Sequence, residues 1–233
     1  MLGKLASCLF VGVWAIGLFP RHVFCDQRPA TKWVIPVSLS LITLGKTIWV
    51  LGIIAWYFVR RPAARRAKRN AVVNNRRSAR DGLGLVAAII GLAVVPGIYV
   101  FSGFPARFDY PLAGWALALG TIVYAAAIWI FRRTHKELGR NWSISLEIRE
   151  EHKLISTGPY SVIRHPMYTS FLLMALGQAC LLANWFVGVA GLIGFAFLFF
   201  LRVQREEKMM IEFFGPQYRD YMDKTKRIIP YIY

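Results

Sequence analysis

The chain has 233 residues, 56% of them hydrophobic, and a formal net charge of +17. Repeated uncharged runs of about 20 residues exclude a soluble globular domain and predict a multi-pass membrane protein. The basic charge does not indicate nucleic-acid binding, because no groove-reading or RNA-binding motif accompanies it.

The apolar runs predict an all-α fold, a multi-pass transmembrane helical bundle of about six spans. In chain order the runs are 5–20, 33–59, 82–104, 112–131, 167–183 and 185–203. The first run, which Lys4 precedes, could also be a signal peptide, but we favour a helix because no clean cleavage site follows it. The last two runs form a helical hairpin, 167–203, that turns at Asn184.

Lys46 falls near the middle of the second run. An ammonium group at the centre of a bilayer costs about 2.5 kcal/mol or more unless it faces a partner or a water-filled cavity. Two interpretations stay open. The helix is tilted and the side chain reaches the membrane surface, or Lys46 lines an internal pocket such as a substrate tunnel.

A basic loop at 60–81 separates the second run from the third. It holds nine of the 29 basic residues: Arg60, Arg61, Arg65, Arg66, Lys68, Arg69, Arg76, Arg77 and Arg80. Lys and Arg stay on the cytoplasmic side of a membrane and attract anionic lipid headgroups. We therefore expect this loop, both chain ends and the polar segment 132–166 in the cytoplasm, and we favour a bacterial inner membrane over the endoplasmic reticulum.

Two further patterns carry no predicted chemistry. The sequence Gly82-Leu83-Gly84-Leu85-Val86-Ala87 matches the residue pattern of a dinucleotide-binding fingerprint. That fingerprint requires a preceding strand, whereas we expect an arginine-rich loop and no strand before Gly82. No metal site is predicted, because metal or redox spacing is absent among the three cysteines, Cys8, Cys25 and Cys180. Close helix packing is expected at three glycines of the last run, Gly188, Gly191 and Gly194.

The polar segment is expected to form a shaped loop at 158–166, because Pro159 and Pro166 both break helices. This loop leads directly into the fifth run. Alone, His165 at that junction would be explained by bonds to the free backbone groups of a helix start.

A second polar cluster lies where the hairpin ends. Arg202 and Glu206 are four residues apart and share a helix face. Because the two ends of a hairpin lie on one side, 158–168 and 202–207 are expected to converge. A carboxylate there can hold an amino group, an arginine can clamp a carboxylate, and Tyr160 and Tyr168 can cover a sulfonium. These parts suit S-adenosylmethionine beside an anionic nucleophile.

The last ninety residues carry four motifs in order. They are His152-Lys153-Leu154-Ile155-Ser156-Thr157-Gly158-Pro159-Tyr160, then Arg164-His165-Pro166-Met167-Tyr168, then Arg202 with Glu206-Glu207, then Phe213-Phe214-Gly215 with Tyr218 and Tyr221. In combination they resemble the isoprenylcysteine carboxyl methyltransferase family of integral-membrane methyltransferases. A weaker similarity lies at 138–143.

The resemblance implies a catalytic region at 132–233, with a cytoplasmic cofactor-binding cap, after N-terminal helices at 1–131. Glu206 would bind the amino group of S-adenosylmethionine and Arg202 would orient the substrate carboxylate, which makes these two the expected catalytic residues. The tail 211–233 would close over the cofactor. The implied cofactor-binding residues are Ser145, His152, Lys153, Leu154, Ile155, Tyr160, His165, Pro166, Met167, Tyr168 and Glu206.

The implied reaction moves a methyl group to a lipophilic acceptor that enters from the bilayer, with the carboxylate of an isoprenylcysteine-like molecule favoured. Phospholipids and small thiols stay open as acceptors, because related methyltransferases share much of the pattern. Two functions of a different class also stay open, an NADPH-dependent membrane sterol-type reductase and a non-catalytic scaffold or transporter. No obligate protein partner is expected.

Overall fold

The computed structural model describes residues 37–67, 72–75, 79–139, 147–149 and 153–233. All of them belong to the unit Ile35–Tyr233. The predicted run at 5–20 lies outside the described residues, and so do nine of the residues singled out above: Lys4, Cys8, Cys25, Lys68, Arg69, Arg76, Arg77, Ser145 and His152.

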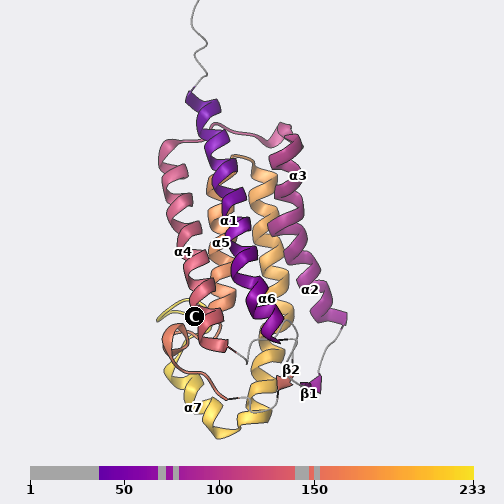
Figure 1. Ribbon diagram of the computed structural model, residues 1–233, viewed down its shortest axis with the longest axis vertical. Coiled ribbons are helices and arrows are strands. Elements are labelled where there is room, and N and C mark those ends of the chain that lie inside the picture. Colours follow the sequence, from indigo (N-terminus) through magenta and orange to yellow (C-terminus); the bar gives the residue numbers. More distant parts are fainter. Residues whose placement is uncertain (1–36, 68–71, 76–78, 140–146, 150–152) are drawn as a thin grey trace, which may run out of the picture. The chain divides into compact units, whose positions relative to one another are not determined.

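The described part of the chain is mostly helical (Figure 1). Its long helical stretches are α1 (Val37–Ala67), α2 (Ala79–Ile89) continuing through the π-helical turn η1 (Ile90–Val94) into α3 (Val95–Ser102), α4 (Gly114–Leu138), α5 (Pro166–Leu181) and α6 (Trp185–Phe214). The predicted runs from the second to the sixth are thus confirmed as helices. Within the described residues, four stretches are long and apolar enough to cross a membrane, and α5 is apolar but shorter.

The basic segment after the second run differs from the predicted loop. Helix α1 continues to Ala67, so 60–67 is helical. The reason is visible in the packing, because Ala63 is fully buried and lies against Leu138 and Met167. Beyond α1, β1 (Val72–Asn75) pairs antiparallel with β2 (Glu147–Arg149), which adds a two-stranded sheet to the predicted all-α fold.

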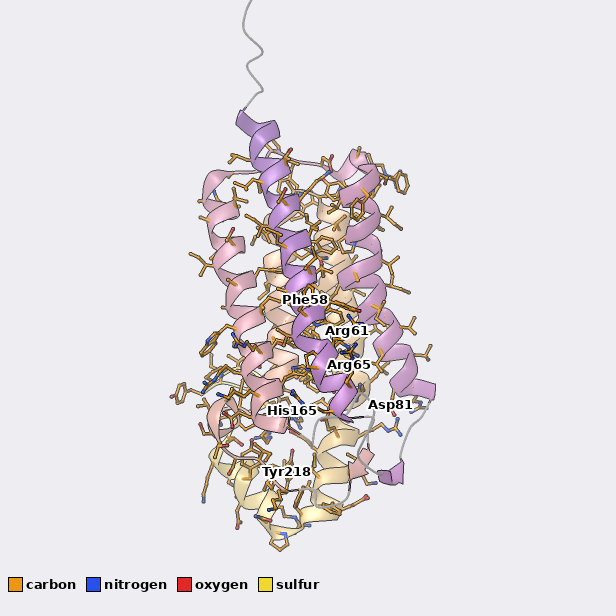
Figure 2. All side chains as sticks on the ribbon, in the orientation of Figure 1. Phe58, Arg61, Arg65, Asp81, His165 and Tyr218 are labelled. Carbon is orange, nitrogen blue, oxygen red and sulfur yellow. The ribbon has the colours of Figure 1, made fainter. Side chains whose placement is uncertain are left out.

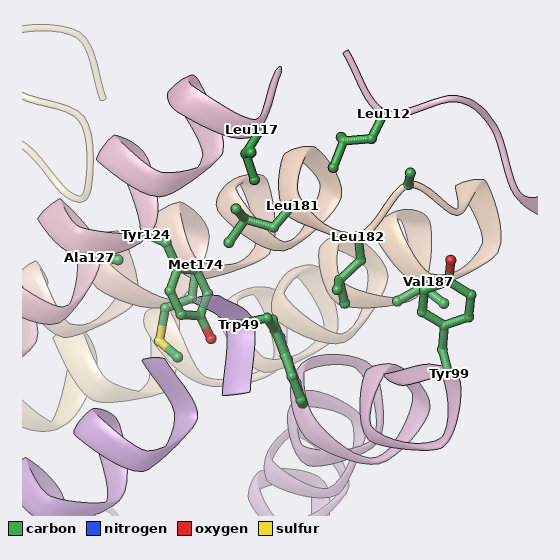
Figure 3. Packing of buried hydrophobic residues seen from close by; sticks show 11 residues of the cluster. Trp49, Tyr99, Leu112, Leu117, Tyr124, Ala127, Met174, Leu181, Leu182 and Val187 are labelled. Carbon is green, nitrogen blue, oxygen red and sulfur yellow. The ribbon is translucent and has the colours of Figure 1, made fainter. Parts of the chain in front are cut away.

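Helix α5 lies inside the bundle and packs against α4 and α6. Most of its residues are buried, as expected for a helix that is apolar on nearly every side. The main cluster of buried residues joins five helical stretches (Figure 3). It includes Trp49 of α1, Tyr99 of α3, Tyr124 of α4, Leu181 of α5 and Val187 of α6.

Glycines bring α6 close to its neighbours. A Cβ atom on Gly194 would lie 2.6 Å from the carbonyl oxygen of Ala87 on α2, and one on Gly191 would lie 2.6 Å from Nε2 of Gln178 on α5. Close packing is therefore confirmed there, and for Gly188 against Ala179.

The glycine pattern at 82–87 lies inside α2 and not in a turn between a strand and a helix. The expectation that no strand precedes it was wrong, because β1 lies on its N-terminal side. That strand pairs antiparallel with β2, and the glycines lie inside α2 rather than at its start, so the described residues do not form the parallel strand–turn–helix unit of a dinucleotide site.

The turn between α5 and α6 is fixed by Asn184, which is 0% exposed. Its Oδ1 accepts a hydrogen bond from the backbone N–H of Val187 at 3.1 Å and caps α6. Its Nδ2 donates to the carbonyl oxygen of Pro105 at 2.9 Å and to Oδ1 of Asp109 at 2.7 Å. The predicted turn is confirmed, and Asn184 also holds the α3–α4 connection.

Lys46 has a specific partner. Its Nζ lies 4.3 Å from the centroid of the Tyr99 ring, so the ammonium faces an aromatic surface of α3. The candidate span of α1 runs from Leu41 to Arg66, which places Lys46 near one end rather than in the middle. A role in lining a substrate tunnel stays a prediction.

Candidate functional site

The start of α5 and the polar part of α6 meet, as the hairpin predicted. The Tyr168 hydroxyl donates to Oε2 of Glu206 at 2.8 Å. One residue further along α6, Oε1 of Glu207 lies 3.2 Å from Nε2 of His165. Because a carboxylate only accepts, the His165 ring donates this hydrogen bond, and its side chain makes no helix-capping bond. The bonds to helix-start backbone groups that would explain His165 alone are therefore not made by its side chain.

Local sequence explains the shape of this junction. Gly158 begins the 3₁₀ helix η4 (Gly158–Ser161) with φ of 59°, a left-handed conformation that suits glycine. Pro166 occupies the first turn of α5, where its missing N–H costs nothing. The shaped loop predicted at 158–166 is confirmed.

Glu207 is the centre of a buried ionic cluster and is 4% exposed. Besides His165, it accepts from Nε of Arg164 at 3.0 Å and from Nη2 of Arg227 at 2.9 Å. The hydrogen bond to Glu207 also raises the pKa of Arg227 above its ordinary value. The cluster joins the loop before α5, helix α6 and the C-terminal tail.

After α7 (Pro216–Lys224), the tail folds back along the loop that precedes α5. The backbone N–H of Arg164 donates to the carbonyl oxygen of Lys226 at 2.7 Å, and that of His165 to Arg227 at 2.9 Å. Thr169 Oγ1 donates to the carbonyl oxygen of Ile228 at 2.7 Å, one turn into α5. The tail therefore covers the start of α5, which is the geometry expected of a closing segment.

Tyrosines surround Glu206. Loss of water around its phenol, followed by the charge of Glu206, raises the pKa of Tyr160 well above the ordinary value. Burial and then the charges of Glu207 and Glu206 raise the pKa of Tyr218 in the same direction. Both phenols stay neutral at physiological pH, so their rings and hydroxyls lie beside the carboxylates without adding negative charge.

The segment before η4 runs along the end of α4 without helix or strand from Lys153 to Ser156. Thr157 Oγ1 donates to Oε2 of Glu137 at 3.2 Å, and a Cβ atom on Gly158 would lie 2.7 Å from the same carboxylate. Leu154 and Ile155 are half-buried, and Lys153 is exposed. Its irregular backbone leaves peptide groups outside any helix or strand.

Arg202 lies one turn before Glu206 on the same helix, as predicted, and is 7% exposed. Helix α6 continues to Phe214, so Arg202 and Glu206 lie within a continuous helix rather than at its end. The remaining predicted site residues at the start of α5 are buried or half-buried: Pro166 and Met167. Ser145 and His152 lie outside the described residues.

Some residues of this site were not predicted. Arg164 and Glu207 stand in the recognised motifs, but only their neighbours His165 and Glu206 received roles. Tyr218 also stands in a motif, but its position in an amphipathic helix did not indicate a functional role. Arg227 had no local signal at all, because its partner Glu207 is 20 residues away.

The donor set suits S-adenosylmethionine. Glu206 offers a carboxylate for an ammonium group, and three tyrosine rings near it suit a sulfonium or a purine. The irregular backbone at 153–157 offers peptide groups for a nucleoside. The residues present therefore fit this group.

Comparison with known proteins also indicates a methyltransferase family. Residues 118–212 match the isoprenylcysteine carboxyl methyltransferase (ICMT) family, which confirms the resemblance carried by the Arg164–Tyr168 and Arg202–Glu207 motifs. The match ends before the Phe-Gly motif at 213–215.

Two relatives illustrate the extent of the similarity. Protein-S-isoprenylcysteine O-methyltransferase B of Arabidopsis thaliana is 32% identical over 96 residues, which are 40% of this chain and 49% of that protein. The Saccharomyces cerevisiae protein-S-isoprenylcysteine O-methyltransferase is 37% identical over 100 residues, 40% of each chain. The chain thus spans about half the length of such relatives or less.

A solved structure of the eukaryotic intramembrane Ras methyltransferase ICMT is also similar, with a TM-score of 0.48 and 25% sequence identity. The similarity covers 69% of this chain and 55% of that one. The four long apolar helical stretches found among the described residues make this chain an integral membrane protein.

Proposed function

We propose that this protein is an integral-membrane methyltransferase that moves a methyl group from S-adenosylmethionine to a lipophilic acceptor. The favoured acceptor group is the carboxylate of an isoprenylcysteine-like molecule. The observation that carries the proposal is the convergence of Tyr168 with Glu206 and of His165 with Glu207 inside the region that matches the methyltransferase family.

Several residues of the chain would hold the cofactor. Glu206 would accept hydrogen bonds from the amino group, and the Tyr168 hydroxyl on Oε2 fixes the orientation of that carboxylate. Tyr160 and Tyr218 provide neutral aromatic surface on the same side. The segment 153–157 would hold the nucleoside of the cofactor through its backbone peptide groups. S-adenosylmethionine supplies an electrophilic methyl group on a sulfonium.

Arg202 orients the acceptor. A guanidinium holds a carboxylate through paired N–H donors, and the burial of Arg202 excludes water that would compete for the same oxygen. A carboxylate is already ionised at neutral pH, so its methylation requires no proton transfer by the protein. An amine or thiol acceptor would require a base, and the positioned arginine therefore favours a carboxylate. Positioning supplies most of the rate.

The orientation in the membrane follows from the arginines of α1. Figure 2 shows Arg61 and Arg65 at the same end of the helices as His165 and Tyr218. Because basic residues stay cytoplasmic, this end, with the methyl-transfer site, faces the cytoplasm. The same arginines attract anionic headgroups. The acceptor enters from the bilayer, and a bacterial inner membrane remains the favoured host.

Calorimetric titration of the purified protein in detergent, with S-adenosylmethionine and separately with NADPH, tests the proposal. Micromolar binding of S-adenosylmethionine alone supports a methyltransferase. Binding of NADPH alone would replace it with a sterol-type reductase, and binding of neither by folded protein would overturn both. Transfer of labelled methyl groups to a prenylcysteine, a phosphatidylethanolamine and a lipophilic thiol then ranks the acceptors.

A further inference from the structure

The contact between α1 and α4 becomes polar near its basic end. The inner face of α4 is apolar up to Phe131 and then presents Thr134 and His135, which are both buried. On α1, the Trp56 ring stacks against Phe131 with centroids 6.0 Å apart, and the Arg60 guanidinium lies 5.1 Å from the Trp56 ring. We call this group of residues the α1–α4 seam.

Two buried polar atoms of the seam, Oγ1 of Thr134 and Nε1 of Trp56, make no hydrogen bond within the described residues. A threonine inside a helix ordinarily donates to the carbonyl oxygen four residues earlier. Thr121 on the same helix does so, to Leu117 at 2.7 Å. A buried polar group without a partner destabilises the fold. A partner for either atom would have to come from beyond the described residues.

The chemistry of the seam defines that partner. The indole of Trp56 can only donate a hydrogen bond, and the Thr134 hydroxyl has a donor to offer. Most of the nearby charges on both helices are positive, with Arg60 at the Trp56 ring and further arginines around it: Arg61, Arg65, Arg66, Arg132 and Arg133. The exception on α4 is Glu137, whose carboxylate already accepts a hydrogen bond from Thr157. Two donors beside a concentration of guanidinium groups fit an oxyanion.

The surroundings identify the source of the oxyanion as the bilayer. Helix α1 lies at the edge of the bundle. Only 11% of the residues in its apolar 18-residue stretch are buried, whereas 50% are buried in the corresponding stretch of α6. Lipids therefore contact α1 directly, including along its border with α4. The tryptophan and the arginines lie toward the end of both candidate spans, which is where headgroups are found.

We propose that the α1–α4 seam binds the phosphate headgroup of an anionic phospholipid, with Thr134 and Trp56 as donors and Arg60 as the countercharge. This site is separate from Glu206 and Arg202 and does not depend on methyl transfer. Bound lipid would tie the edge helix α1 to α4, and through the Ala63 contact to the start of α5.

Thermal unfolding in nanodiscs tests the proposal, with phosphatidylcholine alone compared with an equal mixture of phosphatidylcholine and phosphatidylglycerol. The wild type is expected to gain about 2–4 °C in Tm from phosphatidylglycerol. In a chain of this size, about 1 kcal/mol of added stability raises Tm by this amount. Thr134→Val removes the hydroxyl and keeps the shape. It should unfold at a higher temperature than wild type in phosphatidylcholine and should lose most of the phosphatidylglycerol gain.

Matched variants separate the seam from a general charge effect. Thr121→Val loses an internal hydrogen bond, so it should lower Tm equally in both lipids and keep the full phosphatidylglycerol gain. Trp56→Phe should lose the gain. Trp49→Phe, seven residues earlier on α1, removes an indole N–H that is also buried without a partner but lies in the apolar core, so it should keep the gain. A full gain in Thr134→Val would overturn the proposal, because the surrounding arginines alone would then explain the lipid effect.

Two further arms test the source. Inorganic phosphate added to phosphatidylcholine nanodiscs should produce no gain, and a gain that depends on Thr134 would assign a free-phosphate site instead. A prenylcysteine added without phosphatidylglycerol should likewise produce no Thr134-dependent gain. If it does, and phosphatidylglycerol does not, the seam holds the carboxylate of an acceptor and the phospholipid proposal is wrong.

Discussion

Arg227 donates from both Nε and Nη2 to Oε2 of Glu207, at 3.1 and 2.9 Å. The two residues come from the C-terminal tail and from the middle of the polar part of α6. A buried carboxylate, rather than apolar packing alone, therefore holds the tail over the start of α5. The adjacent Glu206 has a different environment, since it is half-buried and accepts one hydrogen bond from Tyr168.

Replacement of Glu207 by glutamine should destabilise the fold. The amide keeps the shape but removes the charge opposite Arg164 and Arg227, and breaking a buried ion pair costs about 3–5 kcal/mol. Thermal unfolding in detergent measures the loss. Glu206→Gln is the matched control on the neighbouring residue and should change stability by about 1 kcal/mol or less. Equal losses in both variants would contradict the ionic cluster as the main attachment of the tail.

The same pair of variants should behave in the opposite way toward the cofactor. Glu206→Gln keeps an oxygen for the Tyr168 hydroxyl and removes only the charge. A charged hydrogen bond contributes about 1.5–3 kcal/mol, so the Kd for S-adenosylmethionine should rise about 10–100-fold. Calorimetric titration measures it. An unchanged Kd would remove the assignment of Glu206 to the amino group.

Arg202→Lys should lower turnover more than cofactor affinity. Lysine keeps the positive charge but loses the paired donors that orient a carboxylate. We expect kcat/KM for a prenylcysteine acceptor to fall about 10–100-fold, while S-adenosylmethionine binds nearly as in the wild type. Arg205→Lys is the control, because Arg205 pairs with Asp81 at 3.1 Å and has no proposed role in the reaction. If both variants lose the same activity, Arg202 does not position the acceptor.

Gly194→Ala should weaken the contact between α2 and α6. The new methyl group would lie 2.6 Å from the carbonyl oxygen of Ala87, and overpacking of this kind costs about 1–3 kcal/mol. Gly97→Ala in α3 meets nothing within 4 Å, so it should instead stabilise the helix by about 0.5–1 kcal/mol. Opposite shifts in Tm are expected, and a higher Tm for Gly194→Ala would show that the two helices can separate without cost.

Helical periods and turn residues predicted most of the fold. Uncharged runs located the described helices, and Asn184 located the turn of the hairpin. The end of α1 was wrong in the basic segment, because charge suggested a loop where Ala63 packs against Leu138 and Met167. The short pairing of β1 with β2 joins segments about 75 residues apart in sequence, and neither segment has an alternating pattern strong enough to predict it.

The candidate site was predicted less completely than the fold. Helical spacing placed Arg202 and Glu206 on one face, and the hairpin correctly brought the loop at 158–168 to them. Spacing could not distinguish Glu206 from Glu207, since adjacent residues on a helix point in different directions and only the packing of the tail shows which one is buried. Arg227 depends wholly on that tertiary contact.

The ionic cluster also constrains the order in which the protein is made. His165 leaves the ribosome 42 residues before Glu207, and Arg164 leaves 61 residues before Thr225, whose carbonyl oxygen it binds. A nascent chain that has already inserted α5 must therefore hold the loop before it without its partners. The site is completed only after α6 and the tail as far as Arg227 have been translated, so α5 is in place well before the cluster that fixes its start can form.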